Sequence, residues 1–206
     1  MLFDPTEIDP QLAYKLMASL VTPRPIGWTS TIGADGGDNL APFSFFMMIT
    51  SSPPHIALSI GARDGEEKDT LRNIRATSEL VINVVSAALG PQMAITAAEW
   101  PADVDEFAAS SLTPVASEVV RPRRVAEAAA NLECVVRQIF PVGGMPYGAH
   151  LVIAEVVRIH VRDDLVIANN RIDLKRLDPL GRLTGDWYCS TADQYEIHKP
   201  PIEDQE

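Results

Sequence analysis

The spacing of apolar and polar positions changes several times along the chain. Near the start, leucines recur at every fourth position between residues 12 and 20, which is typical of one face of a helix. Asp9 is a favourable N-cap and Pro10 suits the first helical position. A helix is therefore predicted over about residues 10–21, and the prolines that follow end it.

Alternation of apolar with small or polar residues predicts β structure through most of the remaining chain. Residues 25–32 alternate, the glycine-rich segment 34–39 forms a turn, and residues 40–49 complete a hairpin. Further strands are predicted at residues 56–60, 80–85, 132–140, 151–161 and 165–168, with a last β segment at 183–189. Short helices are predicted at residues 69–75, 87–98 and about 104–110. Short strands with few helices predict a mainly β fold, a closed barrel with added helices.

Length and composition favour one domain over residues 1–206, with an irregular surface excursion at about residues 99–120. Hydrophobic residues make up 46% of the chain, which is enough for a core. The formal net charge of −11 argues against a nucleic acid or an anionic membrane as partner. There is no run of 18 apolar residues, no secretory signal and no CxxC pair, so we expect a cytoplasmic protein. The scattered histidines predict no metal site.

Three short segments carry polar side chains that could hold a flavin nucleotide. A phosphate favours a cation at a helix start, which Lys68 and Thr70 could provide. The flavin ring edge favours hydroxyl, amide and backbone groups, which residues 29–31 and 39–44 could provide. Each segment also fits a plain structural role, as a threonine-rich strand face, a turn or a capped surface helix. The residue pattern alone leaves these alternatives open.

Taken together and in order, these segments resemble a known family. The matching stretches are residues 23–31, 39–46, 52–54, 68–74, 81–85, 104–107, 132–134 and 171–173. They are similar to the flavin-reductase-like, FMN-binding split-barrel family, in its flavoredoxin-like branch, over roughly residues 12–188. Residues 47–50, 169–170 and 183–185 depart from the pattern, and the last two segments belong to the part that in this family can line the open face of the flavin.

The resemblance implies a fold, a cofactor and a set of binding residues. The fold would be a Greek-key split barrel that forms a homodimer, with FMN in a groove near the interface. The positions that match the family's flavin-contacting segments are Thr29, Ser30, Thr31, Asn39, Ala41, Ser44, Ser59, Lys68, Asp69 and Thr70, with Arg24 as a weaker candidate for the phosphate.

The resemblance also implies an oxidoreductase, for which three versions remain open. In the first, NADH or NADPH reduces the bound FMN, which then passes electrons to a second flavin, an oxygenase partner or another redox protein. In the second, the protein is a flavoredoxin-like electron carrier without nicotinamide turnover. In the third, it is a flavin-binding module without catalysis. No catalytic acid or base is predicted, because hydride transfer to the flavin requires none.

Overall fold

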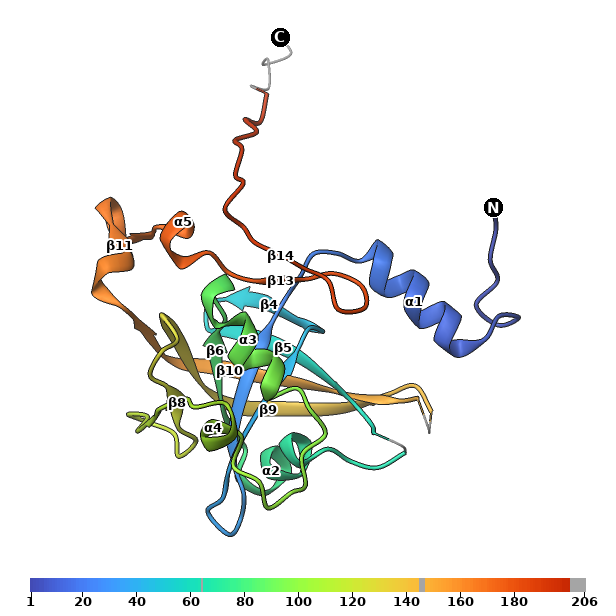
Figure 1. Cartoon of the computed structure of the whole chain (residues 1–206), viewed down its shortest axis with the longest axis horizontal. Coiled ribbons are helices and arrows are strands. Elements are labelled where there is room, and N and C mark those ends of the chain that lie inside the picture. The colour runs from blue at the N-terminus through green and yellow to red at the C-terminus, as the bar shows by residue number, and fades with distance from the viewer. Residues whose placement is uncertain (64, 145–146, 201–206) are drawn as a thin grey trace.

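The computed structural model describes residues 1–63, 65–144 and 147–200. Its centre is a seven-stranded antiparallel sheet with the strand order β3-β2-β6-β9-β10-β5-β4 (Figure 1). The strands of this sheet are β2 (Gly27–Ile32), β3 (Asp38–Phe43), β4 (Phe46–Ser51), β5 (Pro54–Gly61), β6 (Glu79–Val84), β9 (Ala130–Val142) and β10 (Ala149–Val161).

Short helices and strands surround this sheet. The helices are α1 (Pro10–Leu20), α2 (Asp69–Thr77), α3 (Gly90–Ile95), α4 (Glu106–Ala109) and α5 (Leu174–Leu177). A second sheet joins β1 (Arg24–Pro25), β13 (Gly181–Arg182) and β14 (Tyr188–Cys189) in that order. Two small ribbons pair β7 (Pro114–Val115) with β8 (Arg124–Val125), and β11 (Val166–Ile167) with β12 (Arg171–Ile172). Single turns of 3₁₀ helix cover Ala87–Leu89, Asp163–Leu165 and Ala168–Asn170.

The connection between β3 and β4 forces the large sheet to roll up. These strands are at opposite edges of the sheet, yet only Ser44 and Phe45 separate them along the chain. Three Cα–Cα steps, from Phe43 to Phe46, span at most about 11 Å, so the two edges must meet. The N–H of Ser59 donates to the carbonyl of Phe45 at 2.8 Å and holds the junction against β5. This confirms the predicted β-barrel with added helices, but it divides the single strand expected over residues 40–49 into two.

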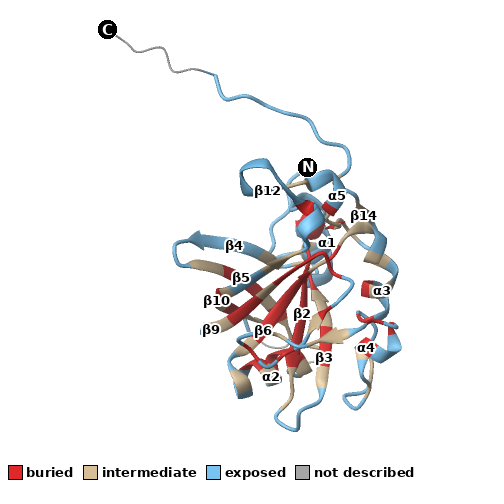
Figure 2. Cartoon of the chain, turned by 90° about the vertical axis from the view of Figure 1, so that its left-hand side faces the viewer, coloured by how far each residue is buried: buried red, intermediate tan, exposed pale blue. Residues whose placement is uncertain are grey.

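Strand β2 is covered on both of its faces, as the burial colours show (Figure 2). One apolar cluster surrounds Leu58 and Ile60 in the barrel and includes Leu71 and Ile74 of α2. A second cluster packs Trp28 of β2 against Phe107 of α4. The strand is therefore the wall between two cores, and its polar residues are enclosed with its apolar ones.

Two of the predicted helical segments differ from expectation. The helix expected over residues 87–98 is a 3₁₀ turn followed by α3, because Pro91 has no N–H for an intrahelical bond and fits only near a helix start. The excursion at residues 99–120 carries α4, whose Phe107 is only 1% exposed. This segment therefore contributes to the apolar cluster around Trp28 as well as to the surface.

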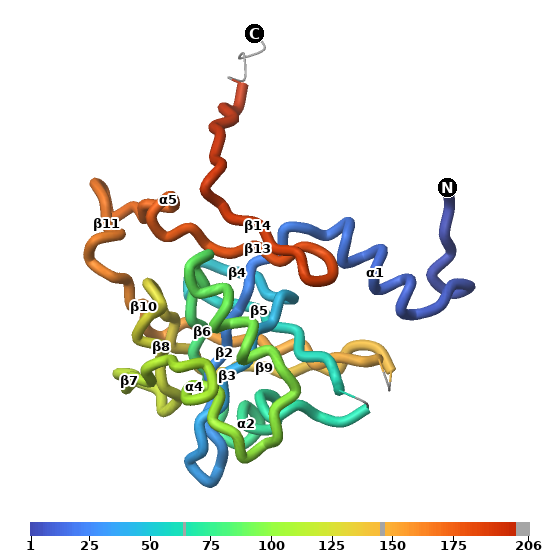
Figure 3. The backbone as a smooth tube through the Cα atoms, in the orientation of Figure 1, coloured from blue at the N-terminus to red at the C-terminus, as the bar shows by residue number. Residues whose placement is uncertain are grey.

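The N-terminal helix and the residues after β14 extend away from the barrel (Figure 3). Helix α1 buries only Ala18, although its leucines form the predicted stripe. Tyr14, Met17 and Leu20 on this helix are 59%, 59% and 77% exposed. Among the described residues, no helix has the length and apolarity that crossing a membrane requires.

Candidate functional site

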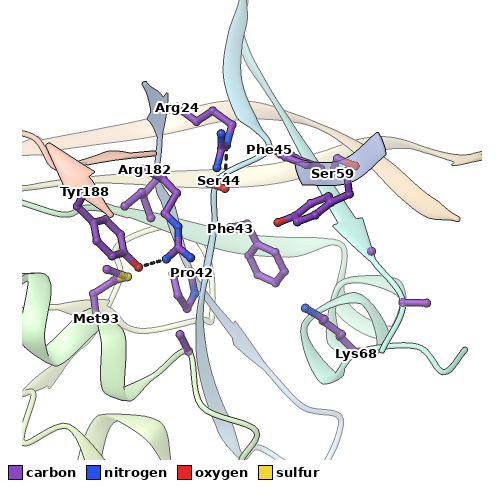
Figure 4. Close-up of a pocket in the computed structure, with 15 residues that line it drawn as sticks. Arg24, Pro42, Phe43, Ser44, Phe45, Ser59, Lys68, Met93, Arg182 and Tyr188 are labelled. Carbon is purple, nitrogen blue, oxygen red and sulfur yellow. Dashed lines mark hydrogen bonds between the residues drawn. The ribbon is translucent and has the colours of Figure 1, made fainter. Parts of the chain in front are cut away.

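A groove of about 410 Å³ lies where the β3–β4 junction, the start of α2 and the β13–β14 hairpin come together (Figure 4). Phe43, Met93 and Tyr188 give it apolar and aromatic walls, while Ser44 and Ser59 add hydroxyl groups. Its full lining is Tyr14, Arg24, Ile26, Pro42, Phe43, Ser44, Phe45, Ser59, Gly61, Ala62, Lys68, Met93, Ala97, Arg182 and Tyr188. The segments that form it are far apart in the sequence, so only the fold creates it.

The charge of this groove is opposite to that of the whole protein. Arg24, Lys68 and Arg182 line it, and no aspartate or glutamate is among its lining residues. The chain as a whole carries a formal charge of −11. A local group of cations in an acidic protein suits a small anionic ligand, whereas the overall charge repels large anionic surfaces.

Lys68 is the cation best placed for a ligand. It is the N-cap residue of α2, and its ammonium lies 5.5 Å from the centre of the Phe43 ring. Burial lowers the pKa of Lys68, the nearby charge of Arg63 lowers it further, and Glu99 opposes both effects. Within the described part of the chain, no carboxylate lies within 4.0 Å of this ammonium. A half-buried ammonium without an anionic partner, at the start of a helix, is the donor that a phosphate requires.

A smaller compartment of about 70 Å³ continues the groove past Lys68. Asn39 and Thr70 line it, and the amide of Asn39 donates to the hydroxyl of Thr70 at 3.1 Å. Glu106 also faces it and accepts the N–H of Leu40 at 3.1 Å. Burial raises the pKa of Glu106 against that hydrogen bond. The compartment is therefore polar, with an amide, hydroxyls and a carboxyl in its walls.

Most of the residues predicted from the family pattern lie around these two spaces. Ser44 and Ser59 line the groove, and Lys68 lines both spaces. Asn39, Ala41, Asp69 and Thr70 line the smaller compartment. The carboxylate of Asp69 pairs with Arg72 in the same helix and makes no cap of α2.

The side chains of Thr29, Ser30 and Thr31 do not reach the groove. All three are 0% exposed, because β2 separates the two cores. The hydroxyl of Thr29 donates to the carbonyl of Gly27 at 3.1 Å, and that of Ser30 donates to the carbonyl of Arg123. The hydroxyl of Thr31 accepts the amide of Asn39 at 3.1 Å. The flavin contacts expected of these three residues stay a prediction, and in this structure the hydroxyl of Thr31 supports Asn39, which lines the smaller compartment.

Arg24 lies in the groove wall, with four of its five N–H donors engaged. Its guanidinium donates to the carbonyls of Ala18, Val21 and Leu183 at 2.6, 2.9 and 2.7 Å. It also donates to the hydroxyl of Ser44 at 3.3 Å. Because Arg24 ties the end of α1 to the C-terminal hairpin, its placement favours a structural role over the expected phosphate contact.

The aromatic and C-terminal side of the groove was not predicted from the sequence. Tyr14, Met93, Arg182 and Tyr188 all line it, and none belongs to a stretch that was singled out for binding. Only residues 183–185, which depart from the family pattern, indicated this region in the sequence. The pairing of β1 with β13 joins segments about 160 residues apart, and no local sequence pattern predicts such a contact. No group of three or more His, Cys, Asp or Glu side chains that could hold a metal lies among the described residues.

The chain is therefore a mainly antiparallel β-barrel with a cationic, aromatic groove at its edge. The model of the "Flavin reductase like domain" matches residues 17–174. The chain therefore belongs to the flavin-reductase-like family, as the sequence indicated.

Individual relatives agree with this assignment. The chain is 40% identical over 192 residues to an uncharacterized protein of Aquifex aeolicus (strain VF5), covering 93% of this chain and 96% of the relative. The crystal structure of nitrilotriacetate monooxygenase component B from Bacillus cereus superposes with a TM-score of 0.91 at 33% identity, covering 96% of this chain and 98% of that one. Flavoredoxin of Desulfovibrio vulgaris (Miyazaki F) shares the fold, with a TM-score of 0.75 at 20% identity over 86% of this chain and 91% of that one.

Proposed function

We propose that this protein binds FMN in the groove and passes electrons from NADH or NADPH through it to a second flavin or a redox protein. The observation that carries the proposal is Lys68, a half-buried ammonium without a carboxylate partner among the described residues, at the edge of an aromatic groove. Bound flavin would supply a ring that takes a hydride from a dihydronicotinamide, which is oxidised in return. The protein supplies the position of the ring and its surroundings.

The residues around the groove fit the parts of FMN. Lys68, with the N–H groups that start α2, would hold the phosphate. Asn39 and Thr70 in the smaller compartment beyond Lys68 would donate to the same phosphate. The ribityl chain, which joins the phosphate to the ring, would lie in the groove between Lys68 and the ring. The apolar and aromatic wall formed by Phe43 and Met93 would contact the ring. The charge, the polyol and the ring of FMN would each meet side chains of matching chemistry.

The visible spectrum of the purified protein tests the proposal. Added FMN should bind, and NADH or NADPH should then remove the absorbance of the oxidised flavin when air is excluded. If a chemical reductant bleaches the bound flavin and neither nicotinamide does, the protein is instead an electron carrier without nicotinamide turnover. A protein that binds no FMN would refute the proposal.

The ionisation of Lys68 makes FMN affinity dependent on pH. Its pKa lies below the ordinary value of 10.5, and only the protonated form attracts the phosphate. Affinity for FMN should therefore be retained below the lowered pKa and fall as the pH rises through it. Lys68→Arg should abolish this fall, because arginine stays charged throughout this range. The affinity is measured by fluorescence titration, with riboflavin, which lacks the phosphate, as the control. The same pH dependence for FMN and riboflavin would contradict this assignment.

We also propose that a second copy of the chain covers α1 and β4. An isolated helix of 11 residues is marginal in water, yet α1 buries only Ala18. On β4, Met47 and Met48 are 56% and 72% exposed. Tyr14 of α1 and Phe45 beside β4 both line the groove, with their ring centres 6.5 Å apart, so this apolar surface is continuous with the site.

Sedimentation velocity tests this homodimer. The wild type should sediment as a dimer, and Met48→Glu should shift it toward the monomer, because the new charge would be buried. Val166→Glu, on the exposed strand β11, should leave the dimer unchanged. A wild type that sediments as a monomer at micromolar concentration, or a Met48→Glu variant that stays dimeric, would refute the interface. The relation to a monooxygenase component B makes an oxygenase one candidate for the electron acceptor.

A further inference from the structure

Arg182, one of the three cations that line the groove, is not used by the proposed FMN contacts. Arg182 lies in β13, paired with Arg24 of β1 on one side and with Tyr188 of β14 on the other. Directly paired residues project from the same face of a sheet. The three side chains therefore form a row across the small sheet, and all of them line the groove.

This row sets two arginines directly opposite each other, an arrangement that is unfavourable without compensation. For Arg24, three backbone carbonyls provide the compensation. The guanidinium of Arg182 donates to the hydroxyl of Tyr188 and to the carbonyl of Gly185, and it lies 4.6 Å from the centre of the Tyr188 ring. Both partners are neutral. In the described part of the chain, no carboxylate lies within 4.0 Å of Arg182, so its charge is held in place but not neutralised.

One FMN phosphate cannot serve both ends of the groove. In Figure 4, Lys68 and Arg182 lie on opposite sides of Phe43. If the phosphate is at Lys68, Arg182 remains beside an aromatic ring at the end formed by β13 and β14. A fixed guanidinium suits the planar, two-point geometry of a carboxylate or phosphate.

We infer that Arg182 is a specificity-determining residue that recognises an anionic group on the second substrate. The ligand class is an aromatic molecule that carries a carboxylate or a phosphate and occupies the groove beside the flavin. The inference rests on the proposed function, because it requires the flavin phosphate to be at Lys68. A phosphate would belong to a nicotinamide dinucleotide, and a carboxylate to an aromatic acid that accepts the electrons.

The test compares anionic with neutral probes on the flavin-loaded protein. Arg182→Gln removes the charge and keeps hydrogen-bond donors, and Arg171→Gln removes an equal charge from an exposed residue of β12 that does not line the groove. NADH and NADPH are compared with 1-benzyl-1,4-dihydronicotinamide, which donates the same hydride without a phosphate. Benzoate is compared with benzamide by titrating the visible spectrum of the bound flavin, which requires no turnover.

Arg182→Gln should raise the half-saturating concentration of the anionic probe about 10-fold or more, as expected for the loss of a charge-assisted hydrogen bond. The neutral probes should be unaffected, and Arg171→Gln should change neither. An effect on the dinucleotides alone identifies a phosphate, and an effect on benzoate alone identifies a carboxylate. Equal losses for charged and neutral probes, or no loss for either, would overturn the inference.

The flavin affinity separates this inference from the proposed function. Arg182→Gln should bind FMN as tightly as the wild type. If it instead binds FMN more weakly, the flavin phosphate is at Arg182 and the inference is wrong. A protein that binds no flavin refutes the proposed function itself, before any anionic probe is added.

Discussion

Replacing Glu133 with glutamine should lower the free energy of unfolding by about 3 kcal/mol, the cost of breaking a buried charged network. Glu133 of β9 is 0% exposed. Its carboxylate accepts the N–H groups of Glu118 and Val119 at 2.8 and 2.7 Å. A ring nitrogen of His160 lies 2.6 Å from it. Glutamine would present an amide nitrogen to these donors, so at least one of them would lose its acceptor.

The same carboxylate should make the stability depend on pH. Burial by itself raises the pKa of Glu133, but the hydrogen bonds from Glu118, Val119, His160 and Val120 lower it, and the net pKa lies below the ordinary 4.5. A lowered pKa contributes stability that is present above pH 4.5 and is lost as the pH falls through the folded value. Glu133→Gln should remove that part of the acid sensitivity.

Urea unfolding at pH 7 and at acid pH measures both effects through the midpoint and its slope. The control is Glu155→Gln on β10, which breaks a partly exposed ion pair with Arg137 and should cost about 1 kcal/mol or less. Equal midpoints for Glu133→Gln and the wild type would show that the loop at residues 117–120 does not depend on this carboxylate.

Replacing Lys68 with alanine should weaken FMN binding by about 1.5–3 kcal/mol, the range for a hydrogen bond to a charged group. The ammonium already bears the cost of burial, which is expressed in its lowered pKa. A phosphate would compensate for that cost, whereas alanine has nothing to offer the phosphate. The barrel should keep its stability, since Lys68 makes no ion pair within the described residues.

Fluorescence titration with FMN and riboflavin measures this effect. Lys68→Ala should bind FMN more weakly and riboflavin almost as well as the wild type, because only FMN carries the phosphate. Lys175→Ala, at an exposed position of α5, is the matched control and should change neither affinity. If FMN affinity is unchanged in Lys68→Ala, the phosphate lies elsewhere in the groove.

The candidate site was predicted best where its residues are close together in the sequence. The start of α2 brings Lys68 and Thr70 to one place through a single helical turn, and the hairpin of β2 and β3 brings Asn39 opposite Thr31. A helix start and a two-strand turn are set by neighbouring residues, so their patterns are local. The face of β2 that meets a ligand depends on what packs against the strand, which no short segment reveals. The threonines of this strand are enclosed.

The sequence by itself determined the β character of the chain, the family and the charged start of α2. Periodicity, turn residues and the ordered family stretches depend on short segments, which is why they can be recognised without a structure. Tertiary structure alone decided that β2 is covered on both faces, that Arg24 binds carbonyls, and that Arg182 and Tyr188 face Lys68 across the groove. These outcomes arise from packing and from pairing between β1 and β13, residues about 160 positions apart, whose contact is fixed only when the whole barrel closes.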